Sequence, residues 1–199
     1  MNLPKQQHWI PQFYLHYFAT PETQNKKIKK TWVSFIDRGL NESRTQNIES
    51  ICSKKYLNSP KNHLDERDFS LEIEFSKLET LTSQFWSLLA TGFTDFSINC
   101  SSRKGIAQFL STLYLRNIDS LRKIKSVHQQ IVDFYRDYPL KLDGTPKIDS
   151  IKIKGKIYKL DTSSWQEYQQ WHKNEHKKFF VNFIRAEAIH FAKILLKKR

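Results

Sequence analysis

The opening segment, residues 8–18, constrains the fold most, because it places a proline inside a run of aromatic and aliphatic side chains. The run reads HWIPQFYLHYF. Proline lacks a backbone N–H and its ring clashes with the preceding turn, so Pro11 cannot lie inside a helix that spans this segment. We therefore expect extended structure from Pro4 to Ile36, with turns near Thr20 and Asn25.

The same segment resembles the opening of a large, mostly bacterial family of unknown function, which begins His-Tyr-Val-Pro-x-Phe-Tyr-Leu-x-x-Phe. The matching positions are His8, Pro11, Phe13, Tyr14, Leu15 and Phe18. The resemblance continues, in the same order, through the apolar run at 31–36, Lys55-Tyr56, a Glu-rich segment from about Glu66, and residues 113–116. Full-length relatives continue into a strand region with a Ser-Asp-x-Pro motif, which has no match here. The resemblance implies a family, with phage defence or mobile elements as its context, but no activity.

Length and composition favour one domain, 1–199, with an extended N-terminal part (1–62), a helical core (63–140), and a hairpin with a C-terminal helix (141–199). Of the 199 residues, 39% are hydrophobic and 14% aromatic, which is enough for a core. The two cysteines, Cys52 and Cys100, are far apart and form no CxxC motif, which favours a reducing compartment. No apolar run has a membrane-spanning length, and the first residues lack a signal-peptide pattern. We therefore expect a cytoplasmic protein.

The periodicity of apolar residues predicts an α+β fold: three long packed helices, an N-terminal β segment and one β-hairpin. Alternating side chains predict a strand from Lys30 to Asp37, with both faces covered. Apolar spacings of three and four predict a short helix near Ile48 and long helices over 66–92 and 103–137. The pattern over 147–160, centred on Gly155, predicts the hairpin. A last helix is expected from Trp165 to the C-terminus.

The net charge of +13 is concentrated at the two ends of the chain. Residues 1–62 carry +6, residues 63–140 carry −1, and residues 141–199 carry +8. Basic ends on a neutral middle indicate a surface that faces a polyanion, so nucleic acid is the first candidate partner. A general preference for surface lysine explains the same composition. The candidate nucleic-acid-binding residues are the lysines of the hairpin, Lys152, Lys154, Lys156 and Lys159.

His8 and Arg116 are the candidate catalytic residues. A histidine before the matched proline has a pKa suited to a general base or a metal ligand, but it can equally satisfy backbone groups in an irregular segment. Arg116 follows a strongly apolar run, where its guanidinium can hold a carboxylate or a phosphate. Alternatively, Arg116 pairs with Glu72, Glu74 or Glu79 of the neighbouring predicted helix.

The segment His172-Lys173-Asn174-Glu175-His176 matches the H-x-x-E-H pattern of some zinc proteases. That chemistry needs a third protein ligand further along the chain, and only 23 residues follow His176. We therefore predict no metal site and no cofactor. The surrounding helix interleaves aromatic and basic side chains, which is typical of single-strand binding and also of a core stripe beside solvated lysines. The aromatic members are Trp165, Tyr168, Trp171, Phe179, Phe180 and Phe183.

An apolar stripe through Phe191 and Leu195 continues nearly to the last residue. A stripe of this kind needs a cover, so a second copy of the chain or a partner protein on the C-terminal helix is the second candidate partner. Three functions remain open from the sequence. They are nucleic-acid association through the basic ends, a nuclease-like or other hydrolase that uses His8, and a truncated, non-catalytic interaction scaffold.

Overall fold

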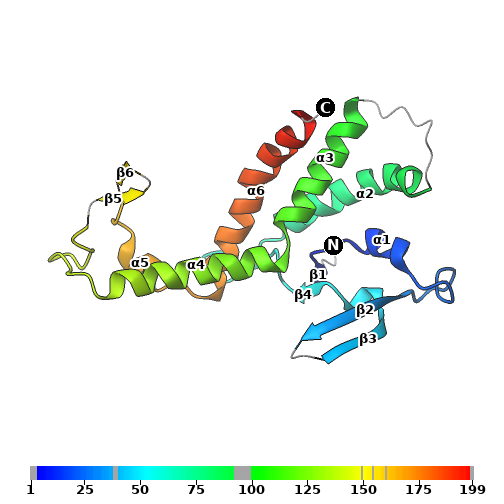
Figure 1. The fold of residues 1–199 in the computed structure, drawn as a ribbon, viewed down its shortest axis with the longest axis horizontal. Helices are drawn as coiled ribbons and strands as arrows, with labels where there is room; N and C mark the ends of the chain where they lie inside the picture. Colours follow the sequence, from blue (N-terminus) through cyan, green and yellow to red (C-terminus); the bar gives the residue numbers. More distant parts are fainter. Residues whose placement is uncertain are drawn as a thin grey trace.

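Four long helices dominate the structure, and three of them form a bundle. The computed structural model describes residues 4–37, 40–91, 100–148, 150–153, 155–159 and 161–197. Helices α2 (Ser70–Ala90), α3 (Cys100–Leu115) and α6 (Lys173–Lys197) pack together, whereas α4 (Ile118–Arg136) leaves the bundle as an arm (Figure 1). Small antiparallel two-stranded sheets complete the fold. The predicted α+β class is confirmed.

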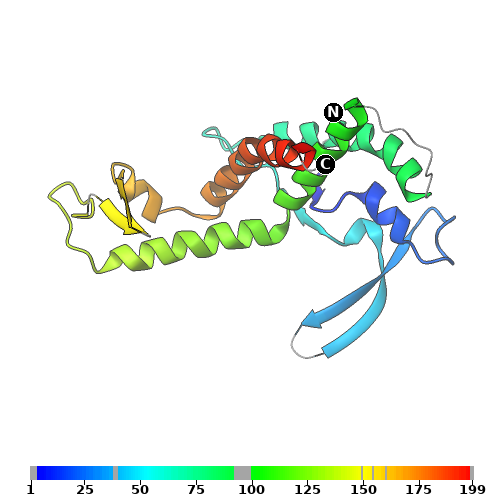
Figure 2. The ribbon, with the colours of Figure 1, turned by 45° about the horizontal axis from the view of Figure 1, so that its top comes forward.

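The N-terminal part contains two of these sheets. Strand β1 (Gln6–His8) pairs with β4 (Ser53–Lys55), and β2 (Lys30–Asp37) pairs with β3 (Leu40–Asn47). The bounds of β2 agree with the predicted strand, but the expectation that both its faces are covered is wrong. The β2–β3 ribbon projects away from the helices (Figure 2), and Trp32 on it is 66% exposed.

Pro11 begins a short helix instead of prolonging extended structure. The φ and ψ of Pro11 are −57° and 142°, and α1 (Gln12–Leu15) follows directly, continued by the 3₁₀-helix η1 (His16–Phe18). A proline is tolerated at a helix start, because the first N–H groups of a helix have no partner within it. The predicted extended structure over 4–36 is therefore wrong for residues 12–18. A second 3₁₀-helix, η2 (Ile48–Ser50), occupies the position of the predicted short helix.

Two of the predicted long helices are each divided in two. The helix expected over 103–137 is α3 followed by α4, because the side chain of Asn117 accepts a hydrogen bond from the backbone N–H of Asp119 (3.0 Å) and caps α4. The last helix is α5 (Trp165–Gln169) followed by α6. The carboxylate of Glu175 accepts a hydrogen bond from the backbone N–H of His172 (3.2 Å). This contact caps the N-terminus of α6, so α6 begins as a separate helix.

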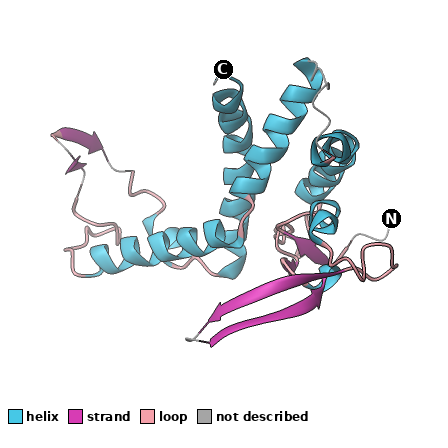
Figure 3. Ribbon diagram, turned by 45° about the vertical axis from the view of Figure 1, so that its right-hand side comes forward, coloured by secondary structure: helices cyan, strands magenta, loops and turns pink. Residues whose placement is uncertain are grey.

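The predicted hairpin is confirmed as β5 (Ser150–Ile153) and β6 (Lys156–Lys159), joined through Gly155 at φ +82°. It lies near the outer end of the arm, over the last turns of α4 and close to α5 (Figures 1 and 3). A positive φ is readily adopted only by glycine, so Gly155 fits the tight turn.

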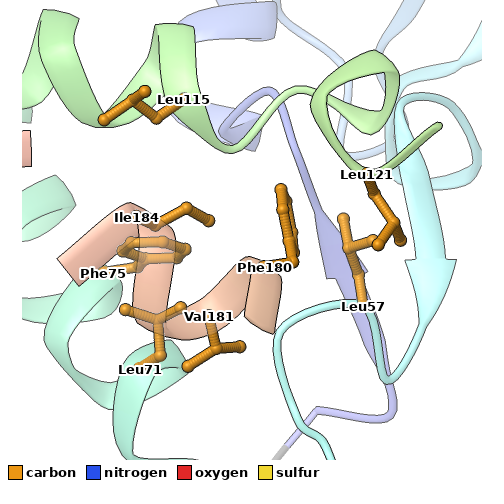
Figure 4. Packing of buried hydrophobic residues seen from close by; sticks show 8 residues of the cluster. All are labelled: Leu57, Leu71, Phe75, Leu115, Leu121, Phe180, Val181 and Ile184. Carbon is orange, nitrogen blue, oxygen red and sulfur yellow. The ribbon is translucent and has the colours of Figure 1, made fainter. Parts of the chain in front are cut away.

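The core lies where α2, α3, α4 and α6 meet the loop that follows β4 (Figure 4). Its buried members are Leu57, Leu71, Phe75, Leu115, Leu121, Phe180, Val181 and Ile184. Phe180 of α6 and Leu57 of the loop are completely buried, so these two elements pack closely together. None of the described helices is long and apolar enough to cross a membrane.

The last turns of α6 remain partly open. Leu195 is 42% exposed, while Phe191 is half-buried and its ring lies 5.8 Å from that of Tyr114. The expected partner on this face stays a prediction.

We predict that Phe180→Ala lowers the free energy of unfolding by about 3–5 kcal/mol, because it removes a large side chain from a closed core. The neighbouring Phe179→Ala is the matched control, since Phe179 is 46% exposed. It should cost no more than about 1 kcal/mol. Urea denaturation followed by circular dichroism measures both values, and equal losses would contradict the position assigned to Phe180.

Candidate functional site

His8 lies at the edge of an acidic pocket of about 550 Å³. It is the last residue of β1, and the pairing with Ser53 of β4 fixes its backbone. Its Nε2 is 3.1 Å from the carbonyl oxygen of Glu49. A carbonyl only accepts, so this contact needs the ring proton on Nε2, whereas the contact of the same nitrogen with the amide nitrogen of Gln12 (3.3 Å) needs Nε2 as an acceptor.

Carboxylates dominate the charge of this pocket, which makes it unusual in a protein of net charge +13. Glu72 and Glu79 lie seven residues apart on α2 and therefore share one face of the helix. Glu49 closes the pocket from η2. The other lining residues are Pro4, Gln6, Gln12, Phe13, Ser76, Thr80 and Ser83.

Arg116 lies beneath the same region and is almost completely buried. Its Nη1 donates to Glu79 at 2.6 Å, and its Nε donates to the carbonyl oxygen of Trp9 at 3.0 Å. Its guanidinium carbon is 4.9 Å from the ring centroid of Phe75. The predicted pairing with a carboxylate of the neighbouring helix is confirmed for Glu79. Arg116 itself is not among the residues that line the pocket, so the contacts found for it are those of a positioning residue.

A buried polar network supports the pocket from behind, and sequence reasoning missed it. Gln7 donates to the hydroxyl of Ser59 (2.6 Å) and accepts from the N–H of Asn58 (2.7 Å). Asn58 in turn donates to the carboxylate of Glu72 (3.0 Å). All three of Gln7, Asn58 and Ser59 are fully buried. The one signal available was the position of Gln7, whose side chain must point opposite to that of His8 on a strand.

Burial moves the pKa values of His8 and Glu72 in opposite directions. It lowers the pKa of His8, with a smaller lowering from the charge of Arg116 and an opposing effect of the hydrogen bond to Glu49. It raises the pKa of Glu72, against the hydrogen bond from Asn58. The pocket therefore favours a neutral imidazole and, elsewhere on its lining, a carboxyl group that holds its proton more tightly than usual. Such a pair can act as base and acid.

The residues of the zinc-protease pattern, His172, Glu175 and His176, lie in three different environments. Glu175 caps the start of α6, and the ring of His176 is buried at 4.7 Å from that of His128. The side chain of His172 is exposed. Within the described ranges, no group of three or more histidine, cysteine, aspartate or glutamate side chains is placed to hold a metal ion.

A second site, which we call the basic junction, lies where β4, the loop 56–69, α4 and the start of α6 come together. Its members are Lys54, Lys55, Lys61, Arg67, Lys125, Lys173 and Lys177. Five of them, with Tyr56 and Asn174, line a pocket of about 230 Å³. Lys61 is paired with Asp65 at 2.5 Å, and Arg67 lies over the ring of Tyr56 at 4.4 Å.

Lys177 is the central residue of the basic junction. It is only 5% exposed, and its ammonium donates to the carbonyl oxygen of Tyr56. Burial and, to a smaller extent, the charges of Arg67, Lys173, Lys54 and Lys125 together lower its pKa to about 8. A buried ammonium surrounded by cations is an unfavourable arrangement unless an anion joins it.

The hairpin lysines lie apart from this junction. Lys152, Lys156 and Lys159 are exposed on β5 and β6, and Lys154 lies outside the described residues. Lys156 and Lys159 are three positions apart on one strand, so they lie on opposite faces of the hairpin. The hairpin therefore presents its lysines on both sides.

A family model described as "Protein of unknown function (DUF4238)" matches residues 6–193. The chain belongs to this family. The membership in a family of unknown function that the opening segment predicted is thus confirmed. The matched range includes the basic junction and all residues that line the acidic pocket except Pro4. No curated protein and no solved structure matches the chain.

We predict that His8 contributes to an acid-induced loss of stability. Burial lowers the pKa of His8 in the folded protein, so the unfolded chain binds this proton more tightly. The stability that His8 contributes is complete above its pKa in the unfolded chain, about 6.5, and is lost as the pH falls through its lower pKa in the folded protein. His8→Gln should therefore reduce the loss of unfolding free energy between about pH 7 and pH 5.

The exposed His63 gives the matched control, His63→Gln, which should leave that pH dependence unchanged. His16 and His176, whose pKa values burial also lowers, keep part of the slope in both variants. An NMR titration that gave His8 a pKa above about 6.5 would contradict the prediction.

Proposed function

We propose that this protein binds nucleic acid through the basic junction. The observation that carries the proposal is the environment of Lys177. Its ammonium group is buried, and the charged side chains that shift its pKa are all cations. Folding brings Lys55 and Lys61 to Lys173 and Lys177 from distant parts of the sequence, so the cluster is a product of the fold and not of one lysine-rich stretch. On the family resemblance alone, we propose phage defence or a mobile element as the context.

The distribution of acidic side chains supports an anionic ligand at the junction. Among the described residues, no aspartate or glutamate lines the junction pocket, whereas Glu49, Glu72 and Glu79 line the pocket of His8. Phosphate groups are therefore attracted to the junction pocket and repelled by the pocket of His8. Lysine ammonium groups around a phosphate backbone also release counterions, which supplies affinity without sequence preference.

The junction pocket is well fixed, which favours binding over a solvated cluster of surface lysines. Asn174 accepts from the N–H of Lys61 (2.8 Å) and donates to its carbonyl oxygen (3.1 Å). Arg67 donates to the carbonyl oxygen of Ser59 (3.0 Å). Ordered cations lose less conformational entropy on binding than free side chains do. The exposed hairpin lysines are a separate, secondary contact in this proposal.

We predict that Lys54→Gln, Lys55→Gln and Lys173→Gln together weaken binding to a labelled oligonucleotide of about 20 nucleotides. All three side chains are exposed, so their removal spares the core. Each lost phosphate contact should reduce the slope of log K against log salt by about 0.7–0.9, or about 2–3 in all. Fluorescence anisotropy between about 50 and 200 mM salt measures the slope.

The matched control replaces three exposed lysines outside the junction, Lys26, Lys27 and Lys193, by glutamine. It changes the net charge equally, so it separates a site from a general charge effect. A third variant, with Lys152, Lys156 and Lys159 replaced, measures the hairpin. Equal losses in the junction variant and the control would contradict the proposal, as would wild-type binding that is indifferent to salt.

A second candidate function, hydrolysis with His8, is favoured by one observation: a neutral imidazole and a carboxyl of raised pKa share the acidic pocket. The carboxylates there favour a neutral or cationic substrate over a phosphodiester. We predict that the protein does not degrade the oligonucleotide that it binds. Gel analysis of labelled DNA and RNA, with and without added Mg²⁺, tests this. Cleavage that His8→Ala abolishes would assign the nuclease activity to His8 instead.

A further inference from the structure

A second pocket adjoins the basic junction and has a different chemistry. It has a volume of about 340 Å³ and lies between α4, α5 and the first turn of α6. Lys173 lines both this pocket and the pocket of the junction. We call it the aromatic pocket, because the ring of Trp171 lines it together with those of His128 and His176.

Trp171 is held in place by the rings around it. It is stacked on His128, with ring centroids 5.7 Å apart and an interplanar angle of 8°. Tyr168 and Phe179 contact it at 4.8 and 5.7 Å. His128 is fixed in turn by a hydrogen bond of 2.7 Å between its Nε2 and the carbonyl oxygen of Tyr168. Trp171 nevertheless remains partly exposed, so it offers a rigid aromatic surface to a ligand.

The aromatic pocket also has polar groups that suit the edge of a base. The amide side chains of Gln129 and Gln169 line it; each has both a donor and an acceptor, and Gln129 already donates to Asp133 (2.9 Å). His176 is more than nine-tenths buried at its wall, and neither of its ring nitrogens has a hydrogen-bond partner among the described residues.

The two pockets are close enough for one short stretch of a strand. Lys177 and Lys173 are one turn apart on α6, a separation of about 6 Å along the helix axis. Stacked nucleotides rise about 3.4 Å each, so about two nucleotides cover this distance. In a duplex the bases are stacked inside and cannot enter a side pocket, whereas unpaired bases can stack on aromatic side chains. Among the described residues, no carboxylate lines either pocket.

We propose that the nucleic acid bound at the basic junction is single-stranded, with its phosphates at Lys173 and Lys177 and an unpaired base in the aromatic pocket against Trp171. This inference rests on the proposed function and specifies its ligand. Both DNA and RNA strands present the required phosphates and bases, and the sugar decides between them only through further contacts.

The test compares labelled single strands of DNA and RNA with a blunt duplex of equal length, by fluorescence anisotropy on the 199-residue chain. The wild type should bind a single strand more tightly than the duplex. Trp171→Ala should weaken single-strand binding about 5- to 100-fold, as the loss of one base–aromatic stack does, and should leave duplex binding nearly unchanged. Trp32→Ala, which removes an exposed tryptophan on β2, is the matched control and should have no effect.

A photocrosslink keeps the proposal testable if Trp171→Ala does not fold. A 5-iodouracil single strand bound to the wild-type protein and irradiated should attach at Trp171, as peptide mapping by mass spectrometry can show. Equal affinity for duplex and single strand, or attachment only at residues outside the aromatic pocket, would overturn this inference while leaving the proposed function intact. The absence of binding to any of the three probes would overturn both.

Discussion

The buried guanidinium of Arg116 is the contact on which the arrangement of the N-terminal half depends. It stands at the end of α3, donates to the backbone of Trp9 just after β1, and donates to Glu79 of α2. One side chain thus connects the end of α3 to the segment after β1 and to α2. Its Nη2 has no partner within the described part of the chain, so the charge is only partly satisfied. Loss of the carboxylate partner of such a group leaves a buried charge uncompensated, which typically costs about 3–5 kcal/mol.

The C-terminal helix depends on a comparable connection to the loop 56–69. Asn174 holds the backbone of Lys61, Lys177 donates to the carbonyl of Tyr56, and Arg185 donates to Ser70 (2.6 Å) and Glu74 (3.0 Å). These side chains lie along α6 and contact the loop 56–69 and the start of α2. The basic junction is therefore a consequence of how α6 is attached, because the side chains that attach it also bring its lysines to Lys55 and Arg67.

Sequence reasoning succeeded where the information was local. The alternation of β2, the turn at Gly155 and the apolar stripes of the helices are properties of short windows, and those elements were predicted. It failed at Asn117, because this residue breaks the apolar stripe only slightly, and only the cap to Asp119 shows that one helix ends and another begins. It failed at residues 12–18, because Pro11 excludes a helix that spans it but permits one that starts after it.

The same distinction separates the parts of the site that were predicted from those that were missed. His8 was found through a family resemblance, and the pairing of Arg116 followed from the neighbouring helices. The partners of Gln7 and Lys177 were not predictable, because Asn58 is 51 residues from Gln7 and Tyr56 is 121 residues from Lys177. Neither contact has a periodic signature. The aromatic side chains predicted for the last helix also have different environments: Phe180 belongs to the core, whereas Trp171 lines a pocket.

The segment from Tyr56 to Ser59 decides how the acidic pocket and the basic junction relate to each other. Tyr56 accepts from Lys177 on the side of the junction, Asn58 donates to Glu72 on the side of His8, and Leu57 between them lies in the core. Leu57, Asn58 and Ser59 are each completely buried, so this segment has no freedom to shift without opening the core. The two pockets are thus held by one rigid strip of backbone. In the proposed complex this strip would keep a polyanion at the junction away from the carboxylates around His8, and the opposite charges of the two sites would set the orientation in which the ligand approaches.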